Sequence, residues 1–174
     1  VIVVYAFASM VIFMIIALSI TNLSIARRKE AQANEDAHAQ LERVINAVTK
    51  VSVILTDMSG TILMFNTGSQ HMLGYSAEEI VGKQTSCVIH LESEVAARGK
   101  ALTEAMGYPI EGFEVFVAHV KQGKYEEREW TYVKKDGKHI TVNLIVTAVK
   151  DAAGAITGFL NIATDITERE LIHK

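Results

Sequence analysis

The pattern of hydrophobic and polar positions divides the chain into three parts. Residues 1–26 carry no charge, and within residues 1–20 only Tyr5, Ser9 and Ser19 interrupt the apolar run. A bilayer core needs about 20 apolar residues in helical form, because backbone polar groups in lipid must bond within their own segment. A signal peptide would begin with basic residues, which are missing here. Residues 1–26 therefore predict a transmembrane helix, with a buried core helix as the alternative.

The end of the apolar run predicts an orientation. Arg27, Arg28 and Lys29 follow it directly. Positive residues beside a membrane segment favour the cytoplasmic side. We therefore expect a single span in the inner (plasma) membrane, with everything after it in the cytoplasm. The chain opens on Val1 rather than Met, so we expect a fragment of a longer membrane protein.

Residues 27–50 predict a helical linker, because they contain good helix formers and no Gly or Pro. Its apolar stripe consists of Ala37, Leu41, Val44, Val48 and Val51. These positions alternate between spacings of four and three, which is the pattern of a heptad. The stripe predicts either a helix that packs on its own domain or a parallel homodimeric coiled coil, and both interpretations stay open.

From Val51 onward the period becomes two. The predicted strands cover residues 51–58, 61–65, 126–134, 139–149 and 155–164, and the longer helices cover 91–106 and 113–120. Two strands, several short helices and three further strands are typical of an α+β fold with an antiparallel sheet. This domain is predicted over residues 51–166.

Local signals support these elements. Ser59-Gly60 and Asp136-Gly137 are turn signals, and the second predicts a tight hairpin because Asp-Gly tolerates positive φ angles. Residues 67–70 and 76–79 both fit the capping-box pattern of a helix start.

Composition and motifs exclude several functions. The net charge is −3, which argues against a nucleic-acid binder. The single cysteine, Cys87, excludes a disulfide framework and a Cys-based zinc site. The six histidines are scattered without metal-ligand spacing, and no catalytic motif is present, so we predict no metal site and no enzyme within this chain. The acidic residues around Arg128, at 126, 127 and 129, predict a solvated strand face.

Several strings together resemble the PAS domain family with its PAC motif. They are Asn66, residues 73–82, residues 129–137 and residues 158–169, in this order and spacing. The resemblance implies a five-stranded antiparallel sheet with short helices on one face, often around a small-molecule pocket. It also implies a sensory or dimerising role in a membrane-bound bacterial signalling protein.

The resemblance raises cofactor hypotheses. Cys87 lies five residues after Gly82, farther than in flavin photosensors of the family, so we interpret it as a small buried hydrophobe. His90 is the first candidate heme ligand, and His71 is the second. Trp130 is the candidate to stack on a flavin or another aromatic ligand, although a core position is the simpler interpretation. No bound cofactor, or an unknown one, is the main expectation.

The chain's end carries the last candidate site. Thr167 and Glu170 fit a capping box, so residues 167–174 predict the start of a helix that leads to an output module. Asp165 is expected to pair with Arg169, or with an arginine on a neighbouring segment, and so to set the angle of that helix. The resemblance implies an output domain beyond Lys174, a histidine kinase or a diguanylate cyclase. A ligand-free dimerisation spacer and a flavin-based redox or metabolite sensor are the alternatives.

Overall fold

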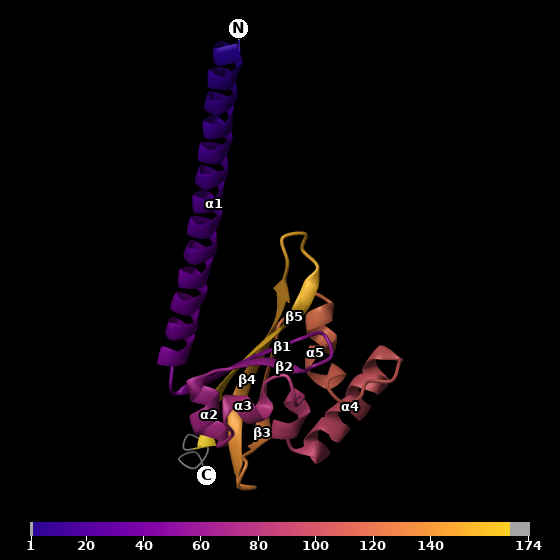
Figure 1. Cartoon of the computed structure of the whole chain (residues 1–174). Coiled ribbons are helices and arrows are strands. Elements are labelled where there is room, and N and C mark those ends of the chain that lie inside the picture. The colour runs from indigo at the N-terminus through magenta and orange to yellow at the C-terminus, as the bar shows by residue number, and fades with distance from the viewer. Residues whose placement is uncertain (1, 168–174) are drawn as a thin grey trace. The chain divides into compact units, whose positions relative to one another are not determined.

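The computed structural model describes the backbone of residues 2–167 and the side chains of residues 13, 14 and 18–167. It forms two compact units, Val1–Val44 and Ile45–Lys174. Helix α1 (Ile2–Ala47) makes up the first unit, and its residues Ile45–Ala47 belong to the second (Figure 1).

Helix α1 runs without a break through the predicted membrane segment and most of the predicted linker, since no Gly or Pro interrupts it. It ends at Ala47 rather than at residue 50, so Val48 lies outside the helix. Among the residues that the structure describes, no helix is long and apolar enough to cross a bilayer. The side chains at 1–12 and 15–17 lie outside those residues, and the predicted membrane segment stays a prediction.

The second unit is built on one antiparallel sheet. Its strands are β1 (Val51–Thr56), β2 (Ile62–Phe65), β3 (Glu126–Val133), β4 (His139–Lys150) and β5 (Ile156–Asp165), in the order β2-β1-β5-β4-β3. The first and last strands in sequence are therefore central neighbours. Val51 at the start of β1 faces Thr164 at the end of β5. The chain consequently enters and leaves the sheet at the same end.

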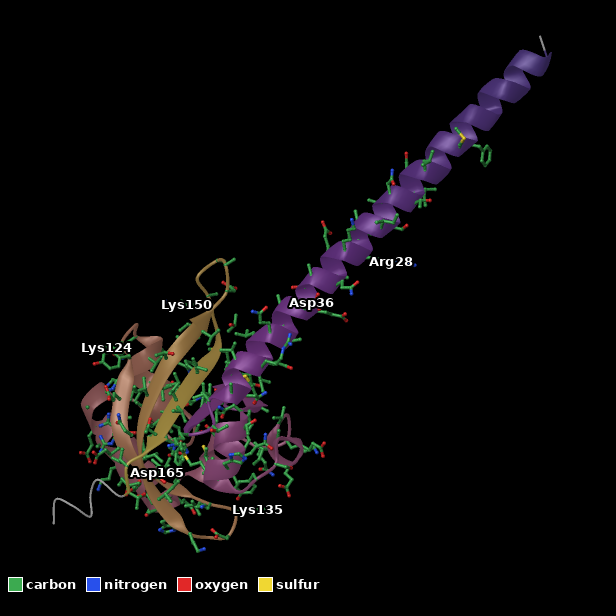
Figure 2. The ribbon with its side chains drawn as sticks, turned by 90° about the vertical axis from the view of Figure 1, so that its left-hand side faces the viewer. Arg28, Asp36, Lys124, Lys135, Lys150 and Asp165 are labelled. Atoms are coloured by element: carbon green, nitrogen blue, oxygen red, sulfur yellow. The ribbon has the colours of Figure 1, made fainter. Side chains whose placement is uncertain are left out.

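The connection between β2 and β3 carries the helices. They are α2 (Thr67–Leu73), α3 (Ala77–Ile80), the 3₁₀ helix η1 (Ser86–Ile89), α4 (Glu92–Met106) and α5 (Glu114–Lys121). Helix α5 packs on β3 and β4, and α4 lies farther out (Figure 1). The Lys135 loop and Asp165 lie toward one end of the sheet, and Lys124 and Lys150 toward the other (Figure 2).

Alternating strand residues build the core against these helices, as the period of two predicted. Ile54, Leu144 and Phe159 are buried on the sheet's inner face, and Val117 of α5 meets them there. The α+β architecture with an antiparallel sheet is confirmed.

Two local predictions are corrected. Asn66, not Thr67, caps α2, and its side chain accepts a hydrogen bond from Ser69 N. Glu126 does not belong to a solvated face. It comes from β3 but pairs with Arg98 of α4 at 2.9 Å and with His119 of α5 at 2.6 Å. Glu127 and Glu129 are exposed as expected. The capping box of Ser76 and Glu79 is confirmed.

Candidate functional site

A cavity among the described residues lies beside the helices and not against the sheet. It measures about 890 Å³, between η1, α4 and residues 110–112. Its buried floor includes His90, Val95 and Gly99, and no strand residue lines it. Gly99 is required there, because a Cβ at this position would lie 2.7 Å from the carbonyl oxygen of Ile110. The close approach of α4 to this loop forms one wall of the cavity.

His90 stands between this cavity and the domain core. Its side chain is only 6% exposed, and Nδ1 lies 2.8 Å from the carbonyl oxygen of Ser86. A carbonyl only accepts, so Nδ1 carries the proton and Nε2 is a bare acceptor. Burial lowers the pKa of His90 to about 4, so the ring is neutral at pH 7. Nε2 is itself buried and has no partner among the described residues.

The ring of His90 belongs to an aromatic cluster that fills the space under the sheet. The cluster consists of His90, Phe113, Phe116, Trp130, Tyr132 and Phe159. The centroid of His90 lies 4.2 Å from that of Phe116 and 5.6 Å from that of Trp130. The structure thus brings together the two cofactor candidates of the sequence, His90 and Trp130. His71 is exposed on α2 and does not line the cavity.

The geometry of the cluster tests the cofactor hypotheses. Trp130 is 4% exposed, and Phe116 packs against it at 5.0 Å between centroids. Burial of His90 Nε2 separates this nitrogen from the cavity. A flavin stacked on Trp130, or a heme on His90, would require the cluster to open. The residues fit neither group in this packed arrangement.

The surroundings of Cys87 do not activate its thiol. Cys87 lines the cavity and is half-buried, and burial raises the pKa of its thiol. A protonated thiol is a weak nucleophile, as expected of a small hydrophobe. In the part of the chain that the structure describes, no group of His, Cys, Asp or Glu side chains could hold a metal ion.

A second candidate site is the N-terminal junction, where α1 meets the domain. We define it by Asn46, Val48, Val51, Asn66, Thr67, Gly68 and Ser69. Asn66 is 1% exposed, and its Nδ2 lies 3.1–3.2 Å from the carbonyl oxygens of Ile45, Val48 and Val51. Its Oδ1 accepts from Val53 N, Ser69 N and Ser69 Oγ. One amide therefore bonds the end of α1, the start of β1 and the first turn of α2.

Asn46 and Gly68 complete this junction. Asn46 Oδ1 accepts from Thr67 N at 3.0 Å and lies 3.2 Å from Thr67 Oγ1, so each helix end receives an Asn from the other segment. A Cβ on Gly68 would lie 2.0 Å from the carbonyl oxygen of Val51. Only glycine permits this approach between α2 and the chain that links α1 to β1.

The C-terminal junction, defined by Thr141, Asp165, Ile166 and Thr167, ends the domain. Asp165 Oδ1 accepts from Thr167 N at 2.9 Å and from Thr167 Oγ1 at 2.6 Å. Thr141 N donates to Thr167 Oγ1, and Ile166 N donates to the carbonyl oxygen of Thr141. Within the described residues the capping carboxylate is thus Asp165. Arg169 and Glu170 lie outside them, and their predicted roles stay predictions.

Asn66 entered the sequence predictions only as part of a family motif, and its bonding role was not predicted. The available signal was an amide side chain placed between a strand and a Thr-Gly-Ser helix start, where caps are common. Its partners Ile45 and Val48 are distant in sequence, so no local pattern indicated them.

Comparisons with known proteins identify the class. The PAS domain family matches residues 50–168. This chain belongs to the PAS domain family. "Two-component system protein A" of Emericella nidulans is 27% identical over 157 residues, covering 89% of this chain and 20% of the relative. "Sensor protein kinase WalK" of Staphylococcus haemolyticus is 26% identical over 161 residues, covering 91% of this chain and 22% of the relative. The chain thus spans about a fifth of the length of these curated relatives.

Solved structures agree on the fold. The crystal structure of the PAS domain of a protein from Colwellia psychrerythraea matches with a TM-score of 0.60 and 22% identity. The match covers 76% of this chain and 99% of that one. At this identity the likeness supports the fold alone.

Proposed function

We propose that this chain is the membrane-anchored sensory PAS module of a signalling protein and relays a signal to an output domain beyond Lys174. The similarity to sensor kinases supports a sensory role. The observation that carries the relay is the pairing of Val51 with Thr164, which brings the two junctions to neighbouring strands. A histidine kinase is the favoured output, because the relatives are named as two-component and sensor kinase proteins.

Membrane anchoring rests on the uncharged residues 1–26 and the basic cluster Arg27-Arg28-Lys29. A reporter fused after Lys174 tests it. A cytoplasm-specific reporter should be active, and the protein should partition into membranes in a form that only detergent extracts. A reporter that works only outside the cytoplasm would contradict the orientation, and extraction by salt alone would contradict the span.

Dimerisation is the second part of the proposal. Leu41 and Val44 are each 60% exposed on α1, and Val48 is 43% exposed just beyond it. Exposed apolar residues at heptad spacing favour a parallel pair of helices. The double variant Leu41→Asp with Val48→Asp should weaken the dimer in analytical ultracentrifugation. Glu42→Gln, on the same helix but outside the apolar stripe, is the matched control. An unchanged dimer in the double variant would place the seam elsewhere.

The relay is tested by fusing the chain to its natural output domain. Asp165→Ala and Thr167→Ala should fix or uncouple the response of the output while the PAS domain stays folded. Asp151→Ala, a cap of the distant β4–β5 turn, is the matched control. If both junction variants respond like the parent, the C-terminal junction is only a cap.

A ligand sensor is the second candidate function. The cavity of about 890 Å³ next to His90 favours it. Mass spectrometry of the purified protein under native conditions should then find a stoichiometric small molecule. A flavin would add absorbance near 450 nm. Protein that carries nothing, and responds to no added metabolite, would favour the ligand-free spacer.

A further inference from the structure

The two junctions lie within one short path of hydrogen-bonded backbone. Asn66 bonds the carbonyl of Val51 and the amide of Val53, so it positions the first residues of β1. Those residues pair with β5, Val51 facing Thr164 and Val53 facing Ile162. Thr164 directly precedes Asp165, the carboxylate of the C-terminal junction. No residue of the cavity belongs to this path, and the aromatic cluster meets the strand pair only through Phe159, which faces Thr56 at the far end of β1.

The bonds at Asn66 leave little freedom at its end of the path. The Asn66 side chain is buried, and all its polar atoms are bonded. The backbone of Gly68 packs directly against the backbone of Val51. Ser52 Oγ and Ser69 Oγ add a buried contact at 2.8 Å between β1 and α2. Saturated buried networks have discrete arrangements, since a partly broken one leaves unpaired polar groups. A displacement of the end of α1 would therefore move β1 rather than be absorbed at the junction.

We propose that the N-terminal and C-terminal junctions are energetically coupled through the β1–β5 strand pair, with Asn66 as the positioning residue that links α1 to this path. The inference deepens the proposed relay and rests on it for its biological meaning. It assigns the transmission of a helix displacement to the end of the sheet where the chain enters and leaves it. The cavity lies outside this path.

Hydrogen exchange of single amides in the 174-residue chain in detergent micelles tests the coupling. Asn66→Asp keeps the size and the acceptor but replaces the NH₂ group that faces three carbonyls. It should speed exchange at Val53 and Ser69, and also about tenfold at Ile166 and Thr167 in the distant junction. Asn46→Ala, an exposed change that spares the core, should give the same pattern more weakly.

Asn161→Asp is the matched control. Asn161 is also a buried asparagine, 5% exposed, and its Nδ2 donates to the carbonyls of Ile54 and Phe159 in the middle of the same strand pair. It has no bond to either junction. In this variant, amide exchange should change mainly in β1 and β5. The ratio of the exchange rate at Ile166 to the rates in the middle of these two strands should stay close to that of the parent.

Reciprocity gives a readout that a merely structural role would not move. A coupling free energy acts equally in both directions. Thr167→Val removes the hydroxyl that bonds Asp165 and Thr141, so under this coupling it should also speed exchange at Val53 and Ser69. Unchanged Ile166 and Thr167 amides in Asn66→Asp and Asn46→Ala would overturn the coupling, and so would equal effects in the Asn161→Asp control. Failure of the kinase fusion with intact exchange coupling would instead overturn the proposed function alone.

Discussion

The N-terminal junction and the aromatic cluster treat a buried polar side chain, Asn66 and His90 respectively, in opposite ways. At the junction, Asn66 finds a partner for every polar atom. In the cluster, His90 bonds through Nδ1 alone, and rings surround the rest of the imidazole. In the first region the polar side chain bonds three segments together. The second leaves an acceptor, His90 Nε2, buried and without a partner among the described residues.

Burial has different consequences for the two side chains. A bonded buried amide specifies one arrangement, because any slip leaves groups unpaired at about 1–3 kcal/mol each. An imidazole bonded at one nitrogen alone specifies less, but its burial resists the gain of a charge. The junction should therefore respond to substitution and the cluster to pH.

The largest expected effect is at Asn66. Asn66→Leu keeps the number and branching of the side-chain heavy atoms but removes every polar contact, leaving the amides of Val53 and Ser69 without their acceptor. We expect a loss of at least about 4 kcal/mol in the free energy of unfolding, measured by urea denaturation. Asn161→Leu is the control and should cost clearly less, because its bonds are longer, at 3.3 and 3.4 Å. Equal losses would mean that the junction has no special weight.

The second effect comes from protonating His90. Its pKa is about 4 in the folded chain against an ordinary value of 6.5. Between these values the unfolded chain binds a proton that the native chain does not, so stability falls as pH drops from 6.5 to 4. The loss should reach about 3 kcal/mol at pH 4 and should be absent above pH 7.

His90→Gln tests the assignment of this pH dependence. Glutamine can donate to the Ser86 carbonyl but does not titrate. The variant should lose the His90 part of the slope between pH 6.5 and 4, read from denaturation curves at several pH values. The single tryptophan, Trp130, gives a local fluorescence signal for the same titration. An unchanged slope would assign the effect to other groups.

The contrast also explains what the sequence could and could not predict. The Ser76–Glu79 capping box and the Asp136-Gly137 hairpin depend on neighbours a few residues away, and both were predicted. The period of two in a strand places Arg128, Trp130 and Tyr132 on one face, where Trp130 and Tyr132 are buried and Arg128 is exposed.

Long-range partners were beyond such patterns. Asn66 bonds Ile45, and Glu126 bonds Arg98, across 21 and 28 residues of sequence. Glu126 looked like part of a solvated strand because its neighbours Glu127 and Glu129 are exposed. Only the approach of α4 and α5 turns it into the centre of an ion-pair group. The family resemblance implied the five-stranded antiparallel sheet, but the strand order β2-β1-β5-β4-β3 was not predicted, because no local signal contains it.

A third prediction separates close packing at the N-terminal junction from ordinary helix preference. Alanine normally stabilises a helix over glycine, but in Gly68→Ala the new Cβ would meet the carbonyl oxygens of Val51 and Val48. We expect a loss of about 2 kcal/mol from the forced shift. Gly107→Ala is the control, since its φ of 77° is strained but the space around it is open. A Gly68→Ala variant that is more stable than the parent would show that the linker moves freely.

The smallest effect is expected at the C-terminal junction, which gives the comparison an exposed reference. Asp165 is exposed, and it accepts from Thr167 N and Oγ1 as a cap does. Water can replace these partners when the carboxylate is removed, so Asp165→Ala should cost only about 1 kcal/mol in urea denaturation. Asp165→Asn, which keeps the acceptor, should cost less. A loss as large as that of Asn66→Leu would mean that exposure does not separate the two junctions, and that the path along β5 supports the whole sheet.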